Sequence, residues 1–597
     1  MRENRYYQIV KQNMAEKSDM TFGYFKSNSL PIEKHREEIV RAVQNNDFLV
    51  IVGETGSGKT TQLSQYLHSA GFTRNGQIIG ITQPRRIAAI SVAKRVADEV
   101  NTTIGREVGY QVRFDDCTSD KTYIKYMTDG CLLKEFLEDS TLSRYAAIIL
   151  DEAHERSLDT DILFGLVKKF FVGKKGRKNP KVIAMSATLN HQKFAEFLGA
   201  CPVIEIPGSI FSVKEIYCDC VTVRDLKNPS YLNKVVETVM TIHSEYPPGD
   251  ILVFLTGQEE IETCCDRLFY KAEKIDYNHD VKSTEVDAII ILPLYGSMTT
   301  ELQRKVFDPP DPSVRKVVVA TNIAATSLTI QGIRYVVDSG FVKQLSCNSR
   351  TGLDSLNVVL ISRSEAIQRK GRAGRTATGT CFRMYTREVY CNSMDQETVP
   401  EIQRTSLSRV VLHLKCMGIN DVVRFQYIDP PEERMVLEAL KQLYYFGAID
   451  KKGHVTLLGH RMVELPLSPG LSRAVISSYD FVCEELVLPV AAMLSVEQVF
   501  ASGSSKSNLA KVSRIQKELA EAAGGTNDFA TLLYIYKECN ESSSPTKWCR
   551  DHFVHWRALK LAVTIHHQLE NILVRQKLKY DKPRNKIASR SGKKAGR

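Results

Sequence analysis

The chain has 597 residues, of which 43% are hydrophobic and 25% are charged. At roughly 100–200 residues per domain this length predicts three to five domains, and the composition excludes collagen-like, coiled-coil and wholly disordered chains. The net charge is +11, but residues 575–597 contain ten Lys or Arg and a single acid, so the remainder of the chain is close to neutral.

Targeting signals are not evident in the sequence. The first residues, MRENRYYQIVKQ, are too polar for a secretory signal, and no stretch approaches the roughly 18 apolar residues that a membrane helix requires. We therefore expect no membrane partner. Fourteen cysteines are scattered along the chain without a CxxC pair, which predicts reduced thiols in an intracellular protein and argues against a zinc site.

Strand–helix alternation begins at Pro31, after a loose N-terminal extension in residues 1–30. In 31–208 the apolar runs FLVIVG, QIIGIT, AAIIL and KVIAMS are typical of buried parallel strands joined by crossover helices. A second series in 209–390 consists of DILVFLTG, AIIILPLYG, KVVVATN and RYVVDSG. The two series have similar lengths and predict two α/β domains in tandem.

Beyond residue 390 the sequence becomes Leu-rich and helical, as in SLSRVVLHLKCMG and ERMVLEALKQLYYFG. We predict a mostly α-helical region in which GHVTLLG forms a small β-wing. Residues 575–597 are rich in Lys, Ser and Gly and are expected to form a disordered basic tail. Such a tail fits a nuclear localisation signal, a nonspecific tether to nucleic acid, or a solubilising terminus.

The segment GETGSGKT follows the first apolar strand and precedes an amphipathic helix, which is the context that a phosphate-binding P-loop requires. Its glycines let backbone N–H groups turn toward phosphate oxygens at the positive end of the helix. Lys59 is predicted to reach the β- and γ-phosphates, and Thr60 to bind Mg²⁺. The predicted nucleotide-binding residues of this segment are Gly53, Glu54, Thr55, Gly56, Ser57, Gly58, Lys59, Thr60 and Thr61.

Two acids, Asp151 and Glu152, directly follow the apolar run AAIIL. Downstream of a P-loop this placement favours a catalytic role over a helix cap. Asp151 is predicted to hold Mg²⁺ through its water shell, and Glu152 to orient or deprotonate the attacking water. Together with Thr60, the two acids form the predicted metal site.

The segment QRKGRAGR places Arg372 and Arg375 three residues apart, flanked by glycine, in a domain that has no P-loop of its own. This spacing can present two guanidinium groups to one phosphate, although a solvated basic turn would look similar. We infer that both arginines are supplied across an interdomain cleft and complete the site only when the domains close.

As a set, the motifs GETGSGKT, TQPRRIAA, TDG, DEAH, SAT, FLTGQEEI, TNIAATSLTI and QRKGRAGR resemble those of the DEAH-box (DEAH/RHA) helicases of superfamily 2. The resemblance continues through PEIQRTSL and WCRDHFVHWRAL and covers residues 31–575. It implies an α/β fold with two tandem RecA-like P-loop domains, at 31–208 and 209–390, then a winged-helix-like segment at 391–465 and a helical ratchet at 466–574.

The same resemblance implies a function. ATP hydrolysis would drive 3′-to-5′ movement along RNA, with remodelling of RNA duplexes or RNA–protein complexes. The expected cofactors are ATP, with other NTPs accepted, and Mg²⁺. The expected partners are RNA bound without sequence preference and an activating protein. The chain is expected to act as a monomer in the nucleus.

By motif position, Gln368 would help to position the attacking water, while Arg372 and Arg375 would bind the γ-phosphate. The residues expected to link the nucleotide site to the interdomain contact are His154, Ser186 and Thr188. The base would be sandwiched by Arg95 and Phe307, although Phe307 could instead be a core aromatic. Such stacking does not read base edges, so weak nucleotide selectivity is expected.

RNA contacts are expected from residues that suit phosphate and 2′-hydroxyl groups without sequence readout. By family position these are Arg85, Arg86, Thr128, Gly130, Thr256, Gly257, Thr321 and Thr326. The segment from Gly340 through Leu353 lies where the family carries a strand-separating β-hairpin.

Three departures from the family pattern qualify these expectations. Ala325 stands where most members have Glu, which removes a carboxylate near the domain interface. Gln331 replaces an Asp that contacts ribose, and its amide can still form hydrogen bonds. The basic tail stands where the family usually has an OB-fold, so we expect that fold to be absent, with its share of RNA and partner binding in doubt.

Two other functions stay open at this point. One is an RNA clamp or assembly factor whose grip depends on nucleotide but which unwinds little; Ala325 and the expected absence of the OB-fold favour it slightly. The other is a P-loop motor that acts on DNA, which motif spacing does not distinguish from an RNA motor. The intact set of phosphate-binding and catalytic residues favours an active RNA-stimulated enzyme.

Overall fold

The computed structural model describes residues 30–54, 56–172, 179–187, 191–208, 211–218, 230–277, 279–283, 285–296, 298, 303, 305–325, 330–347, 354–375, 377–496, 498–500, 506–525 and 527–580. Three residues of the predicted site, Thr55, Thr188 and Thr326, lie outside this part of the chain.

The first lobe is built on an eight-stranded sheet within the described part of 30–208, in the order β4-β3-β5-β2-β6-β7-β1-β8. Neighbouring strands are parallel except β3 and β4. The strands are β1 Phe48–Gly53, β2 Ile78–Gln83, β3 Val108–Val112, β4 Asp115–Cys117, β5 Ile124–Thr128, β6 Tyr145–Leu150, β7 Lys181–Ser186 and β8 Val203–Ile206. The four strands expected from apolar runs are confirmed as β1, β2, β6 and β7.

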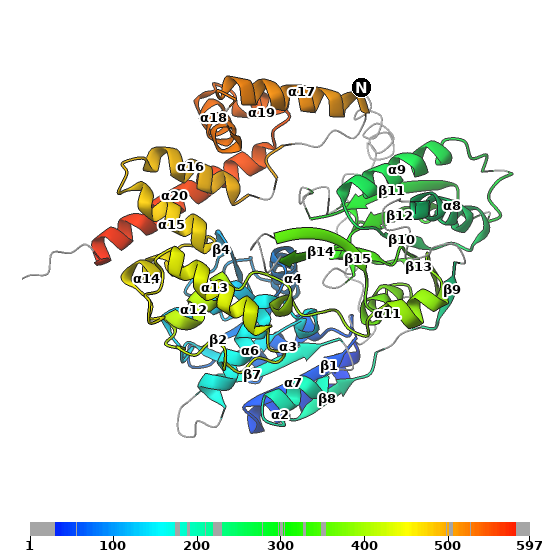
Figure 1. Cartoon of the computed structure of the whole chain (residues 1–597). Coiled ribbons are helices and arrows are strands. Elements are labelled where there is room, and N and C mark those ends of the chain that lie inside the picture. Colours follow the sequence, from blue (N-terminus) through cyan, green and yellow to red (C-terminus); the bar gives the residue numbers. More distant parts are fainter. Residues whose placement is uncertain are drawn as a thin grey trace, which may run out of the picture.

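Helices cover both faces of this sheet (Figure 1). They are η1 Pro31–His35, α2 Arg36–Asn45, α3 Lys59–Ser69, α4 Arg86–Glu99, α5 Asp129–Glu138, η2 Ala153–Glu155, α6 Leu158–Phe171 and α7 His191–Phe197. Side chains of β1 alternate between the two layers: Leu49 and Ile51 join one core, and Val50 and Val52 join the other. Burial on both faces explains why this strand is continuously apolar.

The second lobe is a six-stranded, all-parallel sheet within the described residues, ordered β11-β12-β10-β13-β16-β9. Its strands are β9 Val213–Tyr217, β10 Asp250–Phe254, β11 Ala288–Leu294, β12 Val314–Ala320, β13 Ile333–Asp338 and β16 Gly379–Arg383. Its helices are α8 Ser230–Glu245, α9 Gln258–Ala272, η4 Asn322–Ala324 and α11 Arg363–Gly371. Strands β10 to β13 confirm the four expected from the second apolar series.

A two-stranded antiparallel hairpin, formed by β14 Phe341–Cys347 and β15 Asp354–Leu360, extends from the second lobe toward the centre of the molecule (Figure 1). The sequence places a hairpin at 340–353, and the observed strands reach seven residues further, to Leu360. Leu345 and Leu356, which are 41% and 60% exposed, lie on its surface.

The rest of the described chain is mainly helical. It contains η5 Val389–Ser393, η6 Glu401–Gln403, α12 Ser408–Cys416, α13 Glu433–Tyr445, α14 Leu457–Glu464, α15 Pro469–Ser478, α16 Glu484–Leu494, α17 Lys506–Ala522, α18 Asp528–Glu541, α19 Pro545–Asp551 and α20 Trp556–Tyr580. The expected β-wing is reduced to one antiparallel bridge, between Ile449 and Val455.

The expectation that disorder begins at residue 575 is wrong for residues 575–580, which continue α20 to Tyr580. Leu573 is buried, Gln576 Nε2 donates to the carbonyl of Arg461 at 2.8 Å, and Lys579 pairs with Glu464 at 2.6 Å. These contacts with α14 hold the helix beyond the point where the composition turns basic. Residues 581–597 lie outside the described part of the chain.

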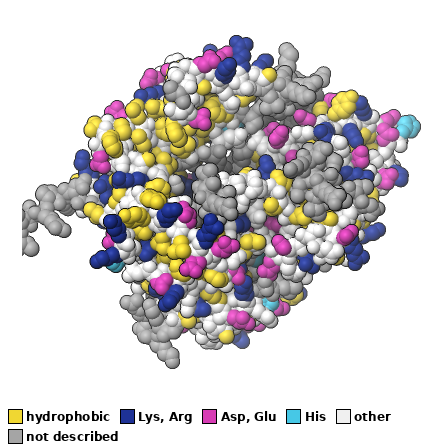
Figure 2. Space-filling model, in the orientation of Figure 1, with side chains coloured by type: hydrophobic (Ala, Val, Ile, Leu, Met, Phe, Trp, Pro, Cys, Tyr) yellow, Lys and Arg dark blue, Asp and Glu magenta, His cyan; other side chains and the backbone are white. Residues whose placement is uncertain are grey.

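The first lobe and the helical region share one hydrophobic core, which includes Phe164 of α6, Val410 of α12 and Ile565 of α20. The second lobe has cores of its own around β10 and β12. Figure 2 shows apolar side chains gathered over the helical region, and a hollow where that region meets the two lobes. Among the described helices, none has the length and apolar character needed to span a bilayer, and the cysteines described are free thiols.

Candidate nucleotide and RNA site

The strand order of the first lobe brings distant motifs to one edge of the sheet. Strands β6, β7 and β1 are neighbours and parallel, so their carboxyl ends lie side by side. Asp151 follows β6, Ser186 ends β7, and the P-loop follows β1. In parallel α/β sheets this edge is where ligands bind.

The P-loop adopts a backbone that glycine permits. Gly56 and Gly58 have φ angles of 96° and 92°, in the left-handed region that other residues rarely adopt. Lys59 begins α3, and its Nζ donates to the carbonyls of Gly53 and Glu54, the latter at 3.0 Å. Burial lowers the pKa of Lys59, and nearby Glu152 and Asp151 oppose that shift. The ammonium group therefore occupies the loop that would cradle phosphate.

Asp151 is held by residues from three separate segments of the first lobe. Its Oδ2 accepts from Thr60 Oγ1 at 2.7 Å and from Gln83 Nε2 at 2.5 Å, and its Oδ1 accepts from the Glu152 N–H at 2.8 Å. Burial, and then repulsion by Glu152, raises the pKa of Asp151 to about 6. The hydroxyl of Thr60 and this carboxylate thus lie together beside Lys59.

The raised pKa of Asp151 predicts that its ionised form destabilises the apo protein. A carboxyl whose folded-state pKa is raised contributes stability below its unfolded value and loses it as pH rises through about 6. Asp151→Asn should therefore raise the free energy of unfolding at pH 7.5 by on the order of 2–3 kcal/mol, and by less at pH 5. The apparent unfolding temperature should rise accordingly. Thermal unfolding without nucleotide or Mg²⁺ at both pH values measures this.

Asp139 provides a control of opposite sign. Hydrogen bonds from Thr141 and Ser143 lower its pKa, so its charge stabilises the fold above the unfolded pKa, and that stability is lost as pH falls. Asp139→Asn should lower the unfolding temperature at pH 7.5. An Asp151→Asn protein that is destabilised more at pH 7.5 than at pH 5 would contradict this reading of Asp151.

Glu152 lies in a turn with a left-handed backbone, at φ 52° and ψ 36°. The side chain is buried, and burial followed by repulsion from Glu155 raises the pKa of its carboxyl. Lys59 and Arg372 act in the opposite direction, which places both cations near this carboxylate. A carboxylate with a raised pKa is suited to accept a proton from water.

His154 connects this turn to the end of β7. Its Nδ1 accepts from the backbone N–H of Ala187 at 3.2 Å, and its Nε2 lies 3.6 Å from Glu152 Oε2. Burial lowers the pKa of His154 to about 4, so the ring is neutral near pH 7 and its Nε2 carries the proton that faces Glu152. Ser186 is buried beside this contact. His154 and Ser186 thus lie together between the turn and the end of β7, and their linking role stays a prediction.

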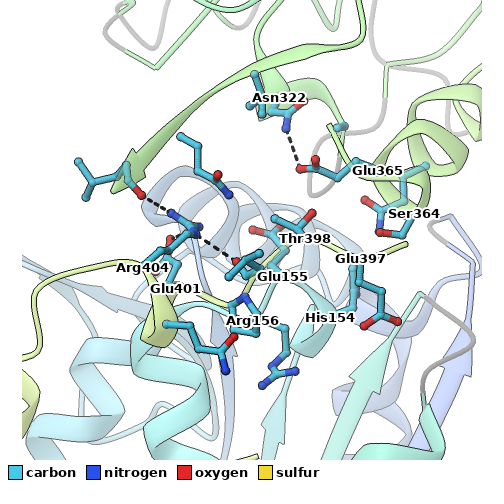
Figure 3. A pocket seen from close by; sticks show the side chains of 18 of the residues that line it. His154, Glu155, Arg156, Asn322, Ser364, Glu365, Glu397, Thr398, Glu401 and Arg404 are labelled. Carbon is cyan, nitrogen blue, oxygen red and sulfur yellow. Dashed lines mark hydrogen bonds and ion pairs between the residues drawn. The ribbon is translucent and has the colours of Figure 1, made fainter. Parts of the chain in front are cut away.

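The second lobe presents its arginines from the end of α11. This helix begins with a capping box, in which the Ser362 side chain accepts from the Glu365 N–H at 3.2 Å and Glu365 accepts from the Ser362 N–H at 3.3 Å. Gln368 lies on the same helix and lines a cavity of about 590 Å³ with His154 and Glu155 (Figure 3).

Arg372, which is buried, and Arg375, which is half-buried, both direct their guanidinium groups toward the acids of the first lobe. Arg372 donates to the carbonyl of Ala325, and burial, then repulsion by Arg375, lowers its pKa. Burial lowers the pKa of Arg375 to about 10, against the influence of Glu152 and Glu54. Its Nη1 has no hydrogen-bond partner among the described residues. Two guanidinium groups with a free donor are suited to an anion.

The lobes are joined directly at this site. Arg85 donates from Nε to Glu155 Oε2 at 3.2 Å and from Nη1 to the carbonyl of Asn322, in the second lobe, at 3.1 Å. Asn322 in turn accepts from Arg369. Its side chain also donates to Glu365 at 3.1 Å, the bond drawn in Figure 3. An expected RNA contact, Arg85, therefore also belongs to the interlobe contact.

A larger cavity of about 1,210 Å³ lies between the first lobe, the winged-helix segment and the ratchet helices. Arg85, Thr128 and Gly130, three of the expected RNA contacts, line it. Arg86 lies beside Asp115 at 3.7 Å, and Asp115 lines the same cavity. These four residues are therefore brought together at one surface.

The expected contacts of the second lobe lie at the carboxyl ends of two neighbouring strands. Thr256 follows β10 and Thr321 follows β12, and these strands are parallel neighbours. Gly257 caps α9, and an added Cβ there would lie 2.8 Å from Lys343 Nζ of the hairpin. The flexible Lys343 side chain of the hairpin thus lies directly against the start of α9.

Sequence reasoning missed several cations that line the larger cavity. They are Arg113, Lys134, Arg144, Arg409 and Arg575. No local motif marks them, because they come from segments that are distant in sequence and meet only in the fold. Arg409, for example, is held by Asp159 across 250 positions of sequence.

Lys134 offers a test of this surface, because it is exposed on α5 and lines the cavity. Lys134→Ala should weaken binding of single-stranded RNA to a similar degree for all sequences. The slope of log K against log salt should fall by about 0.7, the value for one phosphate contact on a single strand. Lys511→Ala, on the exposed side of α17 and outside the cavity, is the matched control. An unchanged salt slope in Lys134→Ala would exclude RNA from this surface.

The two residues expected to sandwich the base lie on different lobes. Arg95 is on α4 and pairs with Glu99 of the same helix at 3.0 Å, and Phe307 is 36% exposed. This exposure argues against a core position for Phe307. Their stacking on a base stays a prediction.

Ala325 and Gln331, the two single-residue departures from the family pattern, differ in their surroundings. Ala325 is buried, and its carbonyl receives Arg372, so the backbone supplies an acceptor where a carboxylate is missing. Gln331 is exposed in the turn before β13. Neither position disturbs the residues gathered around Lys59.

Comparison with known proteins agrees with this geometry. Residues 33–197 match the family described as DEAD/DEAH box helicase, 232–377 match the helicase conserved C-terminal domain, and 439–467 match the winged-helix helicase associated domain (HA2). Two RecA-like lobes with a winged helix and the residues Asp-Glu-Ala-His at 151–154 define the class. The chain belongs to the DEAH-box family of ATP-dependent RNA helicases.

Among its curated relatives are three proteins named "Probable ATP-dependent RNA helicase DHX40", from Pongo abelii, Rattus norvegicus and Homo sapiens. Each is 54% identical to this chain over 558 residues, which cover 93% of this chain and 72% of the relative. Within the family the chain is thus similar to DHX40.

Proposed function

We propose that the protein is an RNA-stimulated ATPase that moves 3′ to 5′ along RNA and remodels RNA duplexes or RNA–protein complexes in its path. One observation carries this proposal: the P-loop and the two acids of the first lobe face Arg372 and Arg375 of the second. Neither lobe alone holds all the groups that phosphoryl transfer uses, so turnover depends on how the lobes are held together.

Each side chain has a task in this reaction. Lys59 would exchange the carbonyls of Gly53 and Glu54 for phosphate oxygens. Glu152 would take the proton of the attacking water, with Gln368 helping to orient that water. Arg375, whose Nη1 lacks a partner in the described residues, would join Arg372 on the γ-phosphate and stabilise the charge that develops there.

The residues present also fit a magnesium ion. The Thr60 hydroxyl and the Asp151 carboxylate lie 2.7 Å apart at the end of the P-loop, and Mg²⁺ prefers such oxygen ligands while keeping several waters. When bound, the ion would neutralise charge on the β- and γ-phosphates. Thr60 would hold it directly, with Asp151 acting through water and Glu152 close by.

The larger cavity is the proposed path of RNA. Its cations, with Thr128 and Gly130, suit contacts to phosphate and sugar that do not depend on sequence. The hairpin of β14 and β15 lies next to this path, because Leu345 and Asp354 line the same cavity. We propose that the hairpin meets the duplex junction as RNA is drawn through.

Direction of movement is tested with two RNA duplexes that differ only in the end that carries the single strand. The full chain with ATP should separate the duplex with a 3′ overhang and leave the one with a 5′ overhang intact. Separation of the 5′-overhang duplex alone would overturn the proposed direction. RNA binding and ATP turnover without separation of either duplex would favour a nucleotide-controlled clamp.

We also propose that the protein acts as a monomer in the nucleus, accepts several nucleotides, and is stimulated by a partner protein. The exposure of Arg95 and Phe307 supports weak selectivity for the base. Comparing turnover of ATP, GTP and CTP tests this, and we expect equal rates.

The seven Lys or Arg residues among 582–597 support nuclear residence. A fusion lacking 581–597 that still enters the nucleus would remove that support.

A further inference from the structure

Residues 394–405, which we call the strap, connect the second lobe to the winged-helix segment and contact both lobes. At its start, the carbonyls of Asp395 and Gln396 accept from the N–H groups of Arg363 and Ser364, at 2.8 and 3.2 Å. The Thr398 hydroxyl lies 2.9 Å from the Ser362 hydroxyl. The strap is therefore fixed to the first turn of α11, the helix that leads to Arg372.

Glu401 fixes the strap to the first lobe, two and four residues after the end of the DEAH motif. Its N–H donates to the carbonyl of Arg156 at 3.2 Å, and its Oε2 accepts from the N–H of Leu158 at 2.9 Å. The carboxylate thus lies at the N-terminus of α6, where a negative charge is favoured. Glu401 thus holds the segment that follows Glu152 at two points, through its backbone N–H and through its carboxylate.

Arg404 fixes the strap to β14 of the hairpin. Its Nη1 donates to the carbonyl of Leu345 at 2.7 Å, and its own carbonyl accepts from the N–H of Cys347 at 2.6 Å. Its Nη2 lies 3.6 Å from Glu401 Oε1, and Figure 3 shows the guanidinium group between the hairpin and Glu401. Two residues of β14, Leu345 and Cys347, are thus held by one arginine.

The loop at residues 152–156, which the strap contacts through Glu401, has a backbone conformation that is unfavourable for non-glycine residues. Glu152 and Arg156 both have left-handed φ angles, of 52° and 51°, on either side of the short helix η2. Non-glycine residues rarely adopt this region and persist there only when their surroundings hold them. For Arg156 those surroundings are Asp161 at 2.7 Å, Asp429 at 2.7 Å and the N–H of Glu401.

From these contacts we propose that Glu401 and Arg404 are positioning residues that tie the hairpin to the loop carrying Glu152, so that the nucleotide state sets the position of the hairpin. The path is short: Glu152, η2, the Arg156 carbonyl, Glu401, Arg404 and β14. Its first part, from Glu152 through η2 to Arg156, is continuous backbone. The links from the Arg156 carbonyl to Glu401, from there to Arg404, and on to β14 are hydrogen bonds or ion pairs. The inference rests on the proposed function, because it gives a purpose to a hairpin on the RNA path.

Hydrogen exchange of the full-length chain tests the link without requiring unwinding. Exchange is followed at 341–347 and at the P-loop, with and without Mg²⁺, ADP and aluminium fluoride. In the wild type, nucleotide should protect both segments, with a change at 341–347 of at least about fivefold, the lower end of typical coupling between sites. In Arg404→Ala, protection should remain at the P-loop and disappear at 341–347.

The possible results of the exchange experiment distinguish a failure of the proposed function from a failure of the inferred link. Lack of protection at the P-loop of the wild type would overturn the proposed function and the inference with it. Protection at the P-loop with no change at 341–347 in the wild type, or an equal change in Arg404→Ala, would overturn the inference alone. Arg424→Ala, which removes an 89% exposed arginine paired only weakly with Asp421, is the control and should behave like the wild type.

A second variant covers the case in which Arg404→Ala fails to fold. Glu401→Gln keeps an amide oxygen for the Leu158 N–H but loses the charge paired with Arg404. In this variant nucleotide should still protect 341–347 from exchange, but less than in the wild type.

As a functional readout, the number of duplexes separated per ATP hydrolysed should fall in Arg404→Ala and recover partly in Arg404→Lys. A purely structural role would lower turnover and separation together and leave that ratio unchanged, which would refute the link.

Discussion

Glu152→Gln should lower RNA-stimulated ATP turnover by a factor of roughly 10²–10⁴, the usual contribution of a general base. The amide has almost the same shape as the carboxylate but cannot take a proton from water. Burial, and then repulsion by Glu155, raises the pKa of this carboxyl, which fits it to that task. Steady-state phosphate release at saturating RNA and ATP measures the effect.

Binding should change little in this variant, since neither the P-loop nor the RNA cavity is altered. Fluorescent nucleotide and RNA titrations should give dissociation constants within about threefold of the wild type, a shift worth less than 1 kcal/mol. Glu438→Gln, on α13 and paired only with Lys441 at 3.8 Å, serves as the matched control. Turnover in Glu152→Gln above a tenth of the wild-type rate would rule out Glu152 as the base.

Arg372→Ala and Arg375→Ala should each lower turnover by about 10³–10⁵, the range known for arginines that stabilise a transferring phosphoryl group. Both guanidinium groups are directed toward the acids of the first lobe, and Arg375 Nη1 lacks a partner among the described residues. Lysine should not restore activity at either position, because an ammonium group cannot bind an oxyanion through two parallel donors. Single-turnover kinetics at saturating ATP isolates the chemical step.

Lys370→Ala is the control for the arginines, since Lys370 lies in the same motif but pairs with Glu215 of the second lobe at 3.0 Å. Its loss should reduce turnover by less than tenfold. Equal losses in all three variants would show that the motif maintains the fold of the second lobe and does not act on the nucleotide.

Much of the fold follows from the sequence because its central strands are apolar on both faces. The runs that became β1, β6 and β10 alternate between two cores and contain few polar residues. Strands β5 and β9, with the sequences IKYMT and VKEIY, were not predicted. Lys125 of β5 is buried against Glu135 at 2.5 Å, and β9 is an edge strand, so neither shows an uninterrupted apolar run.

The nucleotide site could be predicted residue by residue because each of its motifs is local. The order of parallel strands then brings Asp151 and Ser186 to the P-loop. The basic lining of the RNA cavity could not be predicted in this way, and neither could the strap. Arg404 meets Leu345 at a separation of 59 residues and Arg113 meets Pro466 at 353, so only the folded chain shows these contacts.

The end of α20 shows a further limit. The composition of residues 575–580 indicates a solvated tail, yet Gln576 is buried and bonded to Arg461. A long helix continues for as long as one face has a partner, and that partner, α14, lies more than a hundred residues earlier in the chain. Basic residues on its other face stay in water without ending the helix.

Residues of both lobes form one NTPase site, and we propose that RNA controls it. The decisive experiment is steady-state ATP hydrolysis by the full chain, with and without single-stranded RNA and beside single-stranded DNA of the same sequence. We expect low turnover without nucleic acid, at least about tenfold stimulation by RNA, within the range expected for coupled sites, and a weaker response to DNA. RNA that binds without changing turnover would show that it does not control this site.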